Sequence, residues 1–183
     1  MYKELNKKLA TKIALYEQTI DSLPIDDFHK KLIKTNWLDQ IELMEFLTRK
    51  HFAFYNILNA SSIILIGITP LILIIDVPTN SIVYKNMIVS ACSIISSIAL
   101  TFMSAYKYDD KWKHFRNISE DLKLEGENYF ELSSVYEVYG THNEAFKLFC
   151  SKVSDIKRKQ INTYIKEVSQ KGSGKKLELS KNK

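Results

Sequence analysis

The chain contains few of the residues that interrupt helices, cross-link segments or bind metals. Its 183 residues include 5 glycines, 3 prolines, 2 cysteines and 4 histidines. Cys92 and Cys150 show no repeated spacing, which excludes a disulfide framework and suits reduced, apolar side chains. The histidines have no partner at metal-ligand spacing, and no nucleophile or acid–base cluster stands out. We therefore expect no metal, no cofactor and no enzymatic activity.

Charged side chains are also missing from two long segments, residues 52–75 and 86–106. At ~1.5 Å per residue, a helix over either segment exceeds the ~30 Å hydrocarbon core of a bilayer. The core helix of a soluble bundle, the alternative, would carry a polar stripe every three or four residues. The run from Ile63 to Ile75 is instead apolar almost all round. The sequence therefore predicts two transmembrane helices.

The short connection between these segments, residues 76–85, contains Pro78, Thr79, Asn80 and Ser81, which favour a turn. We expect a tight hairpin. Basic residues flank the end of the hairpin that is opposite this connection: Arg49 and Lys50 precede the first segment, and Lys107, Lys111, Lys113 and Arg116 follow the second. The connection carries Lys85 alone, so the positive-inside rule predicts that both termini are cytoplasmic. The net charge of +5 then lies on the inner side, where it favours anionic lipid over nucleic acid as a partner.

The residues outside the two segments have helical patterns. Residues 2–22 form an amphipathic helix, and the absence of glycine and proline from Asp26 to Gly67 predicts one nearly continuous helix over 26–75. The helix of the second segment is predicted to continue to Tyr139. Its contact face repeats near the coiled-coil period and consists of Trp112, Phe115, Ser119, Leu122, Tyr129 and Tyr136.

A further helix follows this one. We expect Gly140 to end the preceding helix in a left-handed conformation, and Thr141 and Glu144 to form a capping box that begins the next. That helix extends to about Ser169 and packs on the first cytoplasmic helices. A disordered basic tail, residues 170–183, is expected to contact lipid headgroups.

The predicted fold is thus an all-α membrane protein, a two-helix transmembrane hairpin that extends into a cytoplasmic helical bundle. The cytoplasmic N-terminal helices cover residues 1–51 and the later cytoplasmic helices residues 107–169.

Small and hydroxyl side chains gather on one face of each apolar segment. At ~100° per residue, five hydroxyl residues of the second segment share an ~80° arc; they are Ser90, Ser93, Ser97, Thr101 and Ser104. The first segment collects Asn56, Asn59, Ala60, Gly67 and Pro70. Two interpretations stay open for the hydroxyl arc, namely the lining of a water-filled pathway in an oligomer and the close packing of helices. Neither segment has a deep charge, which disfavours a proton relay, a voltage sensor or an ion-coupled transporter.

The residues after the second segment resemble the post-membrane signature of the SLATT family, the SMODS and SLOG-associating two-transmembrane domains. The matching residues are Trp112, Phe115, Arg116, Glu120, Leu122, Lys123, Glu125 and Tyr129. Upstream, Asn36-Trp37-Leu38-Asp39 resembles the family's other motif, with Asn36 where arginine is common, and Pro70 also fits. The resemblance covers about residues 31–164.

This resemblance implies a multi-pass effector of the bacterial inner membrane that acts in antiphage defence by abortive infection. Such effectors are thought to oligomerise and permeabilise the membrane when a separate sensor protein or a nucleotide second messenger signals infection. Closed symmetry suggests a homotetramer. Arg116 and Glu120 are four residues apart and predict an ion pair, for which a gating role and a purely structural role both stay open. A membrane-anchored helical scaffold without a pore is the alternative function.

Overall fold

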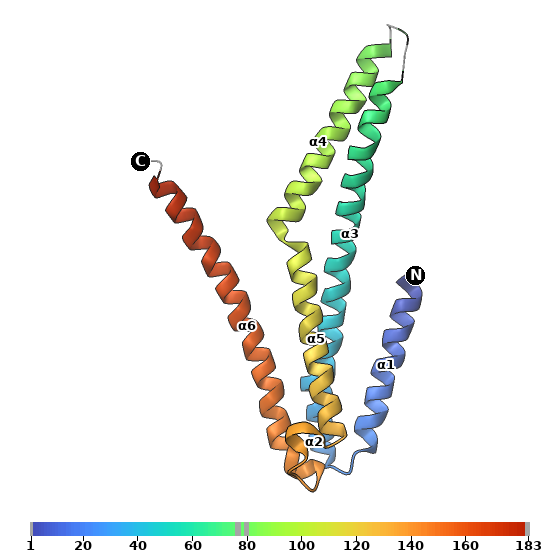
Figure 1. Cartoon of the computed structure of the whole chain (residues 1–183). Coiled ribbons are helices and arrows are strands. Elements are labelled where there is room, and N and C mark those ends of the chain that lie inside the picture. Colours follow the sequence, from blue (N-terminus) through green and yellow to red (C-terminus); the bar gives the residue numbers. More distant parts are fainter. Residues whose placement is uncertain (1, 76–77, 79–80, 182–183) are drawn as a thin grey trace. The chain divides into compact units, whose positions relative to one another are not determined.

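The structure, a computed structural model, describes residues 2–75, 78 and 81–181, and the side chains of residues 7, 9–75, 78 and 81–162. In that part of the chain every regular element is helical. The elements are α1 (Tyr2–Ser22), α2 (Asp27–Ile33), a π-helical segment (Lys34–Leu38), α3 (Asp39–Ile74), α4 (Ile82–Tyr106), α5 (Tyr108–Phe130), a 3₁₀ turn (Ser134–Tyr136) and α6 (His142–Lys181) (Figure 1). They form two compact units. We call residues 45–116 the apolar unit and residues 1–44 with 117–183 the bundle unit.

The long helix predicted from Asp26 is present in the structure. The chain is helical from Asp27 to Ile74, and Pro70 lies inside α3. The π-helical segment at Lys34–Leu38 was not expected. Such segments are rare and often occur at functional sites, because one extra residue in the turn leaves backbone groups out of the regular ladder.

The second long helix differs from its prediction at two places. Lys107 is left-handed, with φ 47° and ψ 49°, and separates α4 from α5. The helix then ends at Phe130 and not at Tyr139. Its end is closed by left-handed Leu132 and by a 2.9 Å hydrogen bond from the Ser133 N–H to the Asn128 carbonyl, as in a Schellman motif.

The chain therefore turns from α5 to α6 without a left-handed glycine. Gly140 has a negative φ, so its predicted conformation is wrong. The capping box is confirmed: the Glu144 N–H donates to Thr141 Oγ1 at 3.4 Å. The Glu144 carboxylate accepts the N–H of Gly140 at 3.1 Å, one residue before the expected position. The backbone of α6 continues to Lys181 instead of ending near Ser169. The side chains of the basic tail predicted for residues 170–183 lie outside the described part.

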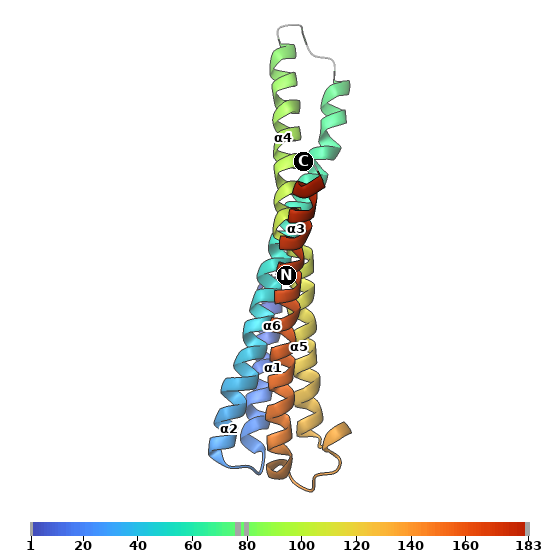
Figure 2. The same ribbon diagram turned by 90° about the vertical axis from the view of Figure 1, so that its left-hand side faces the viewer.

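The bundle unit is built around aromatic side chains. Trp37 is fully buried, and its ring meets Tyr16 and Phe130 edge to face, both at 5.3 Å between centroids. Tyr129 stacks on Phe149 of α6 at 4.4 Å. In Figures 1 and 2, α2 and the adjoining ends of α1, α5 and α6 come together around this core. We expected the apolar stripe of α6 to pack on the first cytoplasmic helices. The ring centroids of Phe149 and Trp37 lie 6.3 Å apart, which confirms this contact.

The apolar unit consists mainly of α3 and α4, which lie side by side in opposite directions (Figures 1 and 2). Both helices are long and apolar enough to cross a membrane. Only 6% and 11% of their most apolar windows are buried, unlike the core helix of a soluble protein. Helix α4 begins at Ile82, so the connection is shorter than the predicted 76–85. Of the expected turn residues, Thr79 and Asn80 lie outside the described residues.

Candidate functional site

The shielded side chains of α3 and α4 recur at alternating intervals of three and four residues. On α3 they include Tyr55, Leu58, Ser62, Leu65, Thr69 and Ile72, and on α4 they are Lys85, Val89, Cys92, Ser96, Ala99 and Met103. This spacing is that of a coiled coil, in which one narrow face of each helix stays in contact with its partner. We call these two series the seam.

The centre of the seam is made of small residues. Ser62, Ser96 and Ala99 are 1%, 4% and 8% exposed. Small residues let two helices approach closely, which is the usual basis of helix packing in lipid. Each buried serine hydroxyl donates to a carbonyl of its own helix at 2.8 Å, Ser62 to Leu58 and Ser96 to Cys92. Burial therefore leaves neither donor unsatisfied.

The face of α3 that the sequence singled out for packing lies beside this seam. Asn59 is half-buried, whereas Asn56, Ala60, Gly67 and Pro70 are exposed. A side-chain carbon added at Gly67 would meet nothing within 4 Å. Contacts of these residues with other copies of the chain stay a prediction. Ser62 was missed, although its place between Leu58 and Leu65 in a seven-residue pattern was a usable signal.

The hydroxyl residues of α4 form a second, uncovered face. All five predicted residues are exposed: Ser90, Ser93, Ser97, Thr101 and Ser104. The middle three donate to carbonyls four residues earlier, Ser93 and Ser97 at 2.9 Å and Thr101 at 2.7 Å. These internal bonds satisfy the donors and leave hydroxyl lone pairs for water or a neighbouring helix. The hydroxyl face therefore flanks the seam and does not form it.

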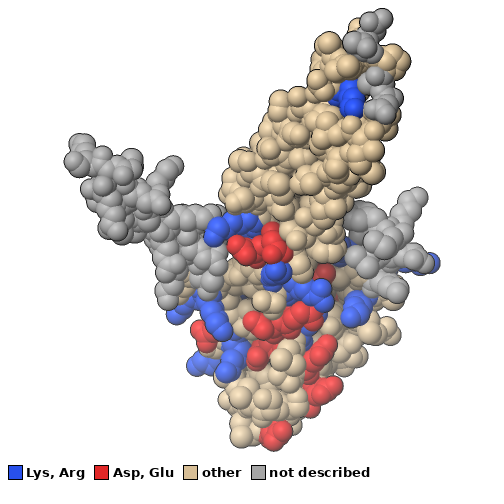
Figure 3. Space-filling view, turned by 45° about the horizontal axis from the view of Figure 1, so that its top comes forward, with Lys and Arg blue, Asp and Glu red and all other residues tan. Residues whose placement is uncertain are grey.

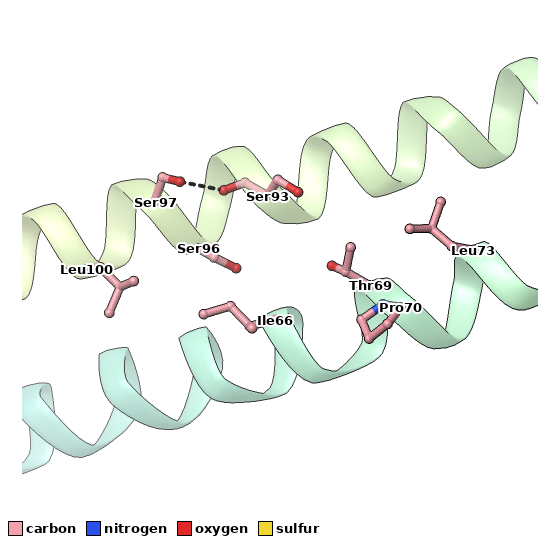
Figure 4. A pocket seen from close by; sticks show the side chains of 8 residues that line it. All are labelled: Ile66, Thr69, Pro70, Leu73, Ser93, Ser96, Ser97 and Leu100. Carbon is pink, nitrogen blue, oxygen red and sulfur yellow. Dashed lines mark hydrogen bonds between the residues drawn. The ribbon is translucent and has the colours of Figure 1, made fainter.

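A pocket of about 310 Å³ joins the hydroxyl face to α3 (Figure 4). It is lined by Ile66, Thr69, Pro70 and Leu73 of α3 and by Ser93, Ser96, Ser97 and Leu100 of α4. In Figure 4 the Ser96 hydroxyl points toward α3. Because proline has no N–H and crowds the preceding turn, it loosens the helix locally. The arrangement offers hydroxyl groups to water or to a second chain in an otherwise apolar surface.

Lys85, near the start of α4, binds the C-terminus of α3. Its ammonium group donates to the carbonyls of Leu73 at 2.8 Å and Ile75 at 2.7 Å, at the C-terminus of α3. A cation is favourable there because the last carbonyls of a helix lack partners and carry partial negative charge. On the face of the molecule that Figure 3 shows, the part formed by the apolar segments of α3 and α4 is almost entirely uncharged. The sequence pointed to Lys85 only as a loop charge.

The opposite end of the apolar unit gathers aromatic residues from α3 and α5. The ring centroids of Trp112 and Phe52 lie 5.1 Å apart. The indole N–H of Trp112 donates to the Asp109 carboxylate at 3.0 Å. Phe115 stacks on His51 at 5.4 Å. Burial, with Lys111 and Lys50 as further causes, lowers the pKa of His51 below its usual 6.5. Two predicted motif residues therefore meet His51 and Phe52, for which sequence reasoning gave no role.

The remaining motif residues belong to the bundle unit. The Trp37 indole N–H donates to the Leu122 carbonyl at 2.7 Å. Tyr129 donates to the His142 carbonyl at 3.0 Å, and Tyr136 donates to Glu125. Burial raises the pKa values of both tyrosines, which keeps their hydroxyls protonated.

The predicted ion pair has members in both units. Glu120, in the bundle unit, pairs with Lys123 at 3.1 Å. Arg116, in the apolar unit, is exposed. The Arg116–Glu120 pair therefore stays a prediction.

Gly126 is required by the position of Trp37. A Cβ atom on Gly126 would lie 2.0 Å from Cζ2 of the indole, a distance that real atoms do not tolerate. Gly126 lies inside α5 and is buried. No group of three or more potential metal ligands occurs among the described residues.

Comparison with known proteins gives one match. No curated protein and no solved structure matches the chain. The profile of a family described as "Protein of unknown function (DUF4231)" matches residues 39–144, from the first residue of α3 to the first turn of α6. Because the match covers more than half of the sequence, the chain belongs to the DUF4231 family.

Proposed function

We propose that the protein is a pore-forming effector of bacterial antiphage defence, similar to the SLATT family. Oligomers of the chain open on a signal from a separate sensor protein or a nucleotide second messenger and depolarise the inner membrane. Growth of the infected cell then halts. The all-helical DUF4231 domain is compatible with a SLATT-like domain, and the motif from Trp112 to Tyr129 supports this assignment.

One observation carries the proposal: the hydroxyl face of α4 stays exposed while a different face forms the seam. If the hydroxyl residues served only to pack α4 on α3, they would be covered as Ser96 is. They are instead available to other copies or to water. Rings of such hydroxyls around a symmetry axis can hold water without a fixed charge.

The proposed placement in the membrane follows from the charges of the apolar unit. The α3–α4 pair crosses the bilayer, and Lys85 marks the outer side. The inner side carries Arg49, Lys50, Lys107 and Lys111, together with the aromatic pair of Phe52 and Trp112. Positive charges favour the cytoplasmic side, and aromatic side chains favour the membrane–water interface. Both termini and the bundle unit are then cytoplasmic, and a homotetramer is the expected assembly.

The proposal is tested by following membrane potential in bacteria that express the chain during phage infection. Wild type should depolarise the membrane, and Ser97→Phe should not, because a phenyl ring on the hydroxyl face would obstruct the pathway. Ile95→Phe is the matched control, since Ile95 is exposed on another face of the same helix. Protection from phage without depolarisation would refute the pore.

The alternative is a membrane-anchored scaffold, which the aromatic core of the bundle unit supports because this core does not depend on membrane-spanning residues. Replacing residues 52–106 by an unrelated transmembrane hairpin separates the two functions. A scaffold would keep its protective activity in this chimera, whereas a pore would lose it.

A further inference from the structure

The bundle unit contains a pocket that the proposed pore does not use. Its volume is about 140 Å³, and it lies between the segment around the π-helical turn and the first half of α6. It is lined by Leu32, Ile33, Asn36 and Trp37 and, from α6, by Phe149, Cys150, Val153, Ser154 and Lys157. A dry cavity of ~150 Å³ is large enough to hold benzene. The pocket thus has the size of a six-carbon body.

One side of this pocket is positively charged. Lys157 is the only basic residue of the lining, and no lining residue is acidic. Among the described residues Lys157 has no ion-pair partner, and its ammonium group instead donates to the Asn36 carbonyl. Partial burial lowers the pKa of Lys157, the direction expected for a cation that has lost part of its hydration. An ammonium group has three donors, and this carbonyl uses one of them.

A second donor lies one turn further along α6. The side-chain amide nitrogen of Gln160 is buried and has no hydrogen-bond partner in the described part of the chain. Residues 153, 157 and 160 are spaced so that they share one face of a helix. Buried donors are normally satisfied, and an unpaired one calls for a missing acceptor. Gln160 is thus an unpaired donor on the same face of α6 as Lys157, although it does not line the pocket.

The rest of the lining is apolar except for Asn36 and Ser154. Leu32 is partly exposed, and the deeper apolar lining residues are each at most 3% exposed, namely Ile33, Trp37, Phe149 and Val153. Burial raises the pKa of Cys150, so its thiol is neutral and adds no negative charge. A strongly hydrated dianion such as phosphate would lose its water here against a single cation. A monoanion with an apolar body loses less and gains contact with these walls.

We propose that this pocket binds a small carboxylate with an apolar body of about six carbons. The carboxylate pairs with Lys157 and the apolar body fills the space beside Phe149 and Val153. The site combines apolar side chains with a few polar groups, a combination found in small-molecule pockets.

The position of the pocket gives binding a consequence for the membrane helix. A carboxylate paired with Lys157 would draw the ammonium group toward itself and so lengthen its bond to the Asn36 carbonyl, and Asn36 lies in the π-helical segment that continues directly into α3. A bound carboxylate would therefore favour a different local winding at the start of α3. This regulatory step rests on the proposed pore, whereas binding itself does not.

Binding is tested with benzoate on the full chain purified in detergent. In a Trp112→Phe background the remaining tryptophan, Trp37, forms part of the pocket wall, so its fluorescence reports occupancy. Benzoate should change this fluorescence saturably. Benzamide, which has the same shape without the charge, should bind at least tenfold more weakly. Lys157→Met should weaken benzoate binding at least tenfold, and Lys147→Met, an exposed lysine of the same helix, should leave it unchanged.

Two results would overturn the site: no saturable response to benzoate, or equal binding of benzoate and benzamide to the unsubstituted pocket. The benzamide comparison needs no pocket variant, so it decides the question even if Lys157→Met fails to fold. Since no step measures conductance, failure here leaves the pore proposal standing, and loss of depolarisation in cells leaves this site standing.

Discussion

The side chains that are buried most deeply in the bundle unit are large, whereas those in the apolar unit are small. Trp37, Tyr129, Tyr136 and Phe149 fill the bundle unit, and Ser62, Ser96 and Ala99 form the centre of the seam. Burial of aromatic surface drives folding in water. In lipid that driving force is absent between helices, and close approach of small residues replaces it. The bundle unit thus has the packing typical of a core formed in water, and the apolar unit has the packing typical of helices in lipid.

The exposed side chains also distinguish the two units, because in the apolar unit large apolar side chains are exposed. Ile63, Ile74, Val83 and Met87 of the apolar unit are all more than half exposed. Such a surface would aggregate in water, but it matches hydrocarbon. The chain passes from one unit to the other within α3, between residues 44 and 45, and within α5, between residues 116 and 117.

The largest effect is expected from Trp37→Ala. Removing this fully buried indole should cost ~3–5 kcal/mol of stability, since it leaves a cavity and frees the Leu122 carbonyl. Trp112, which is only partly buried, is the matched control, and Trp112→Ala should cost clearly less stability. Denaturation of the full chain in detergent, followed by circular dichroism, measures both. Equal losses of stability in the two variants would show that Trp37 is no more important for packing than Trp112.

Gly126→Ala should destabilise the chain by about 1–3 kcal/mol, because the new methyl group overlaps the Trp37 ring and the core must shift. Gly67→Ala tests the same substitution in the apolar unit. It should change stability by less than ~0.5 kcal/mol in detergent, as the site is open. The same denaturation experiment compares the two, and a harmless Gly126→Ala would show that the indole does not pack as described.

Lys85→Met should loosen the outer end of the α3–α4 pair by roughly 0.3–1 kcal/mol, the usual value of a cation at a helix C-terminus. Faster amide hydrogen exchange at the start of α4 is the expected readout, with the bundle unit unchanged. Lys113→Met is the control, because Lys113 pairs with Asp109 at the opposite end. If exchange at the outer end is the same in both variants, Lys85 does not hold the two helices together.

The smallest effect concerns pH and His51. Because the folded pKa of His51 lies below the ordinary 6.5, the unfolded chain binds more protons as pH falls below that value. Stability from this group is therefore complete above pH ~6.5 and is lost on acidification. His51→Phe keeps the stack on Phe115 and should flatten this part of the curve of melting temperature against pH. A curve parallel to that of wild type would exclude His51 as the source.

The helices could be predicted from sequence because they depend on local patterns. Long uncharged runs predicted α3 and α4, and the Thr141–Glu144 capping box predicted the start of α6. The left-handed residues Lys107 and Leu132 were not predictable, since neither is a glycine and tertiary packing overrides their preference.

The candidate site was only partly predictable for a similar reason. The hydroxyl arc of α4 follows from helical periodicity alone. The seam, the clash at Gly126 and the bond from Lys157 to Asn36 depend on which helices meet. That information lies in contacts between residues far apart in the chain.

High-resolution imaging of the full chain in a lipid disc tests the proposed pore most directly. We expect a symmetric oligomer in which Ser93, Ser97 and Thr101 surround the central axis while Ser96 stays in the seam with α3. Hydroxyl residues that face lipid, or a chain without a central assembly, would contradict it.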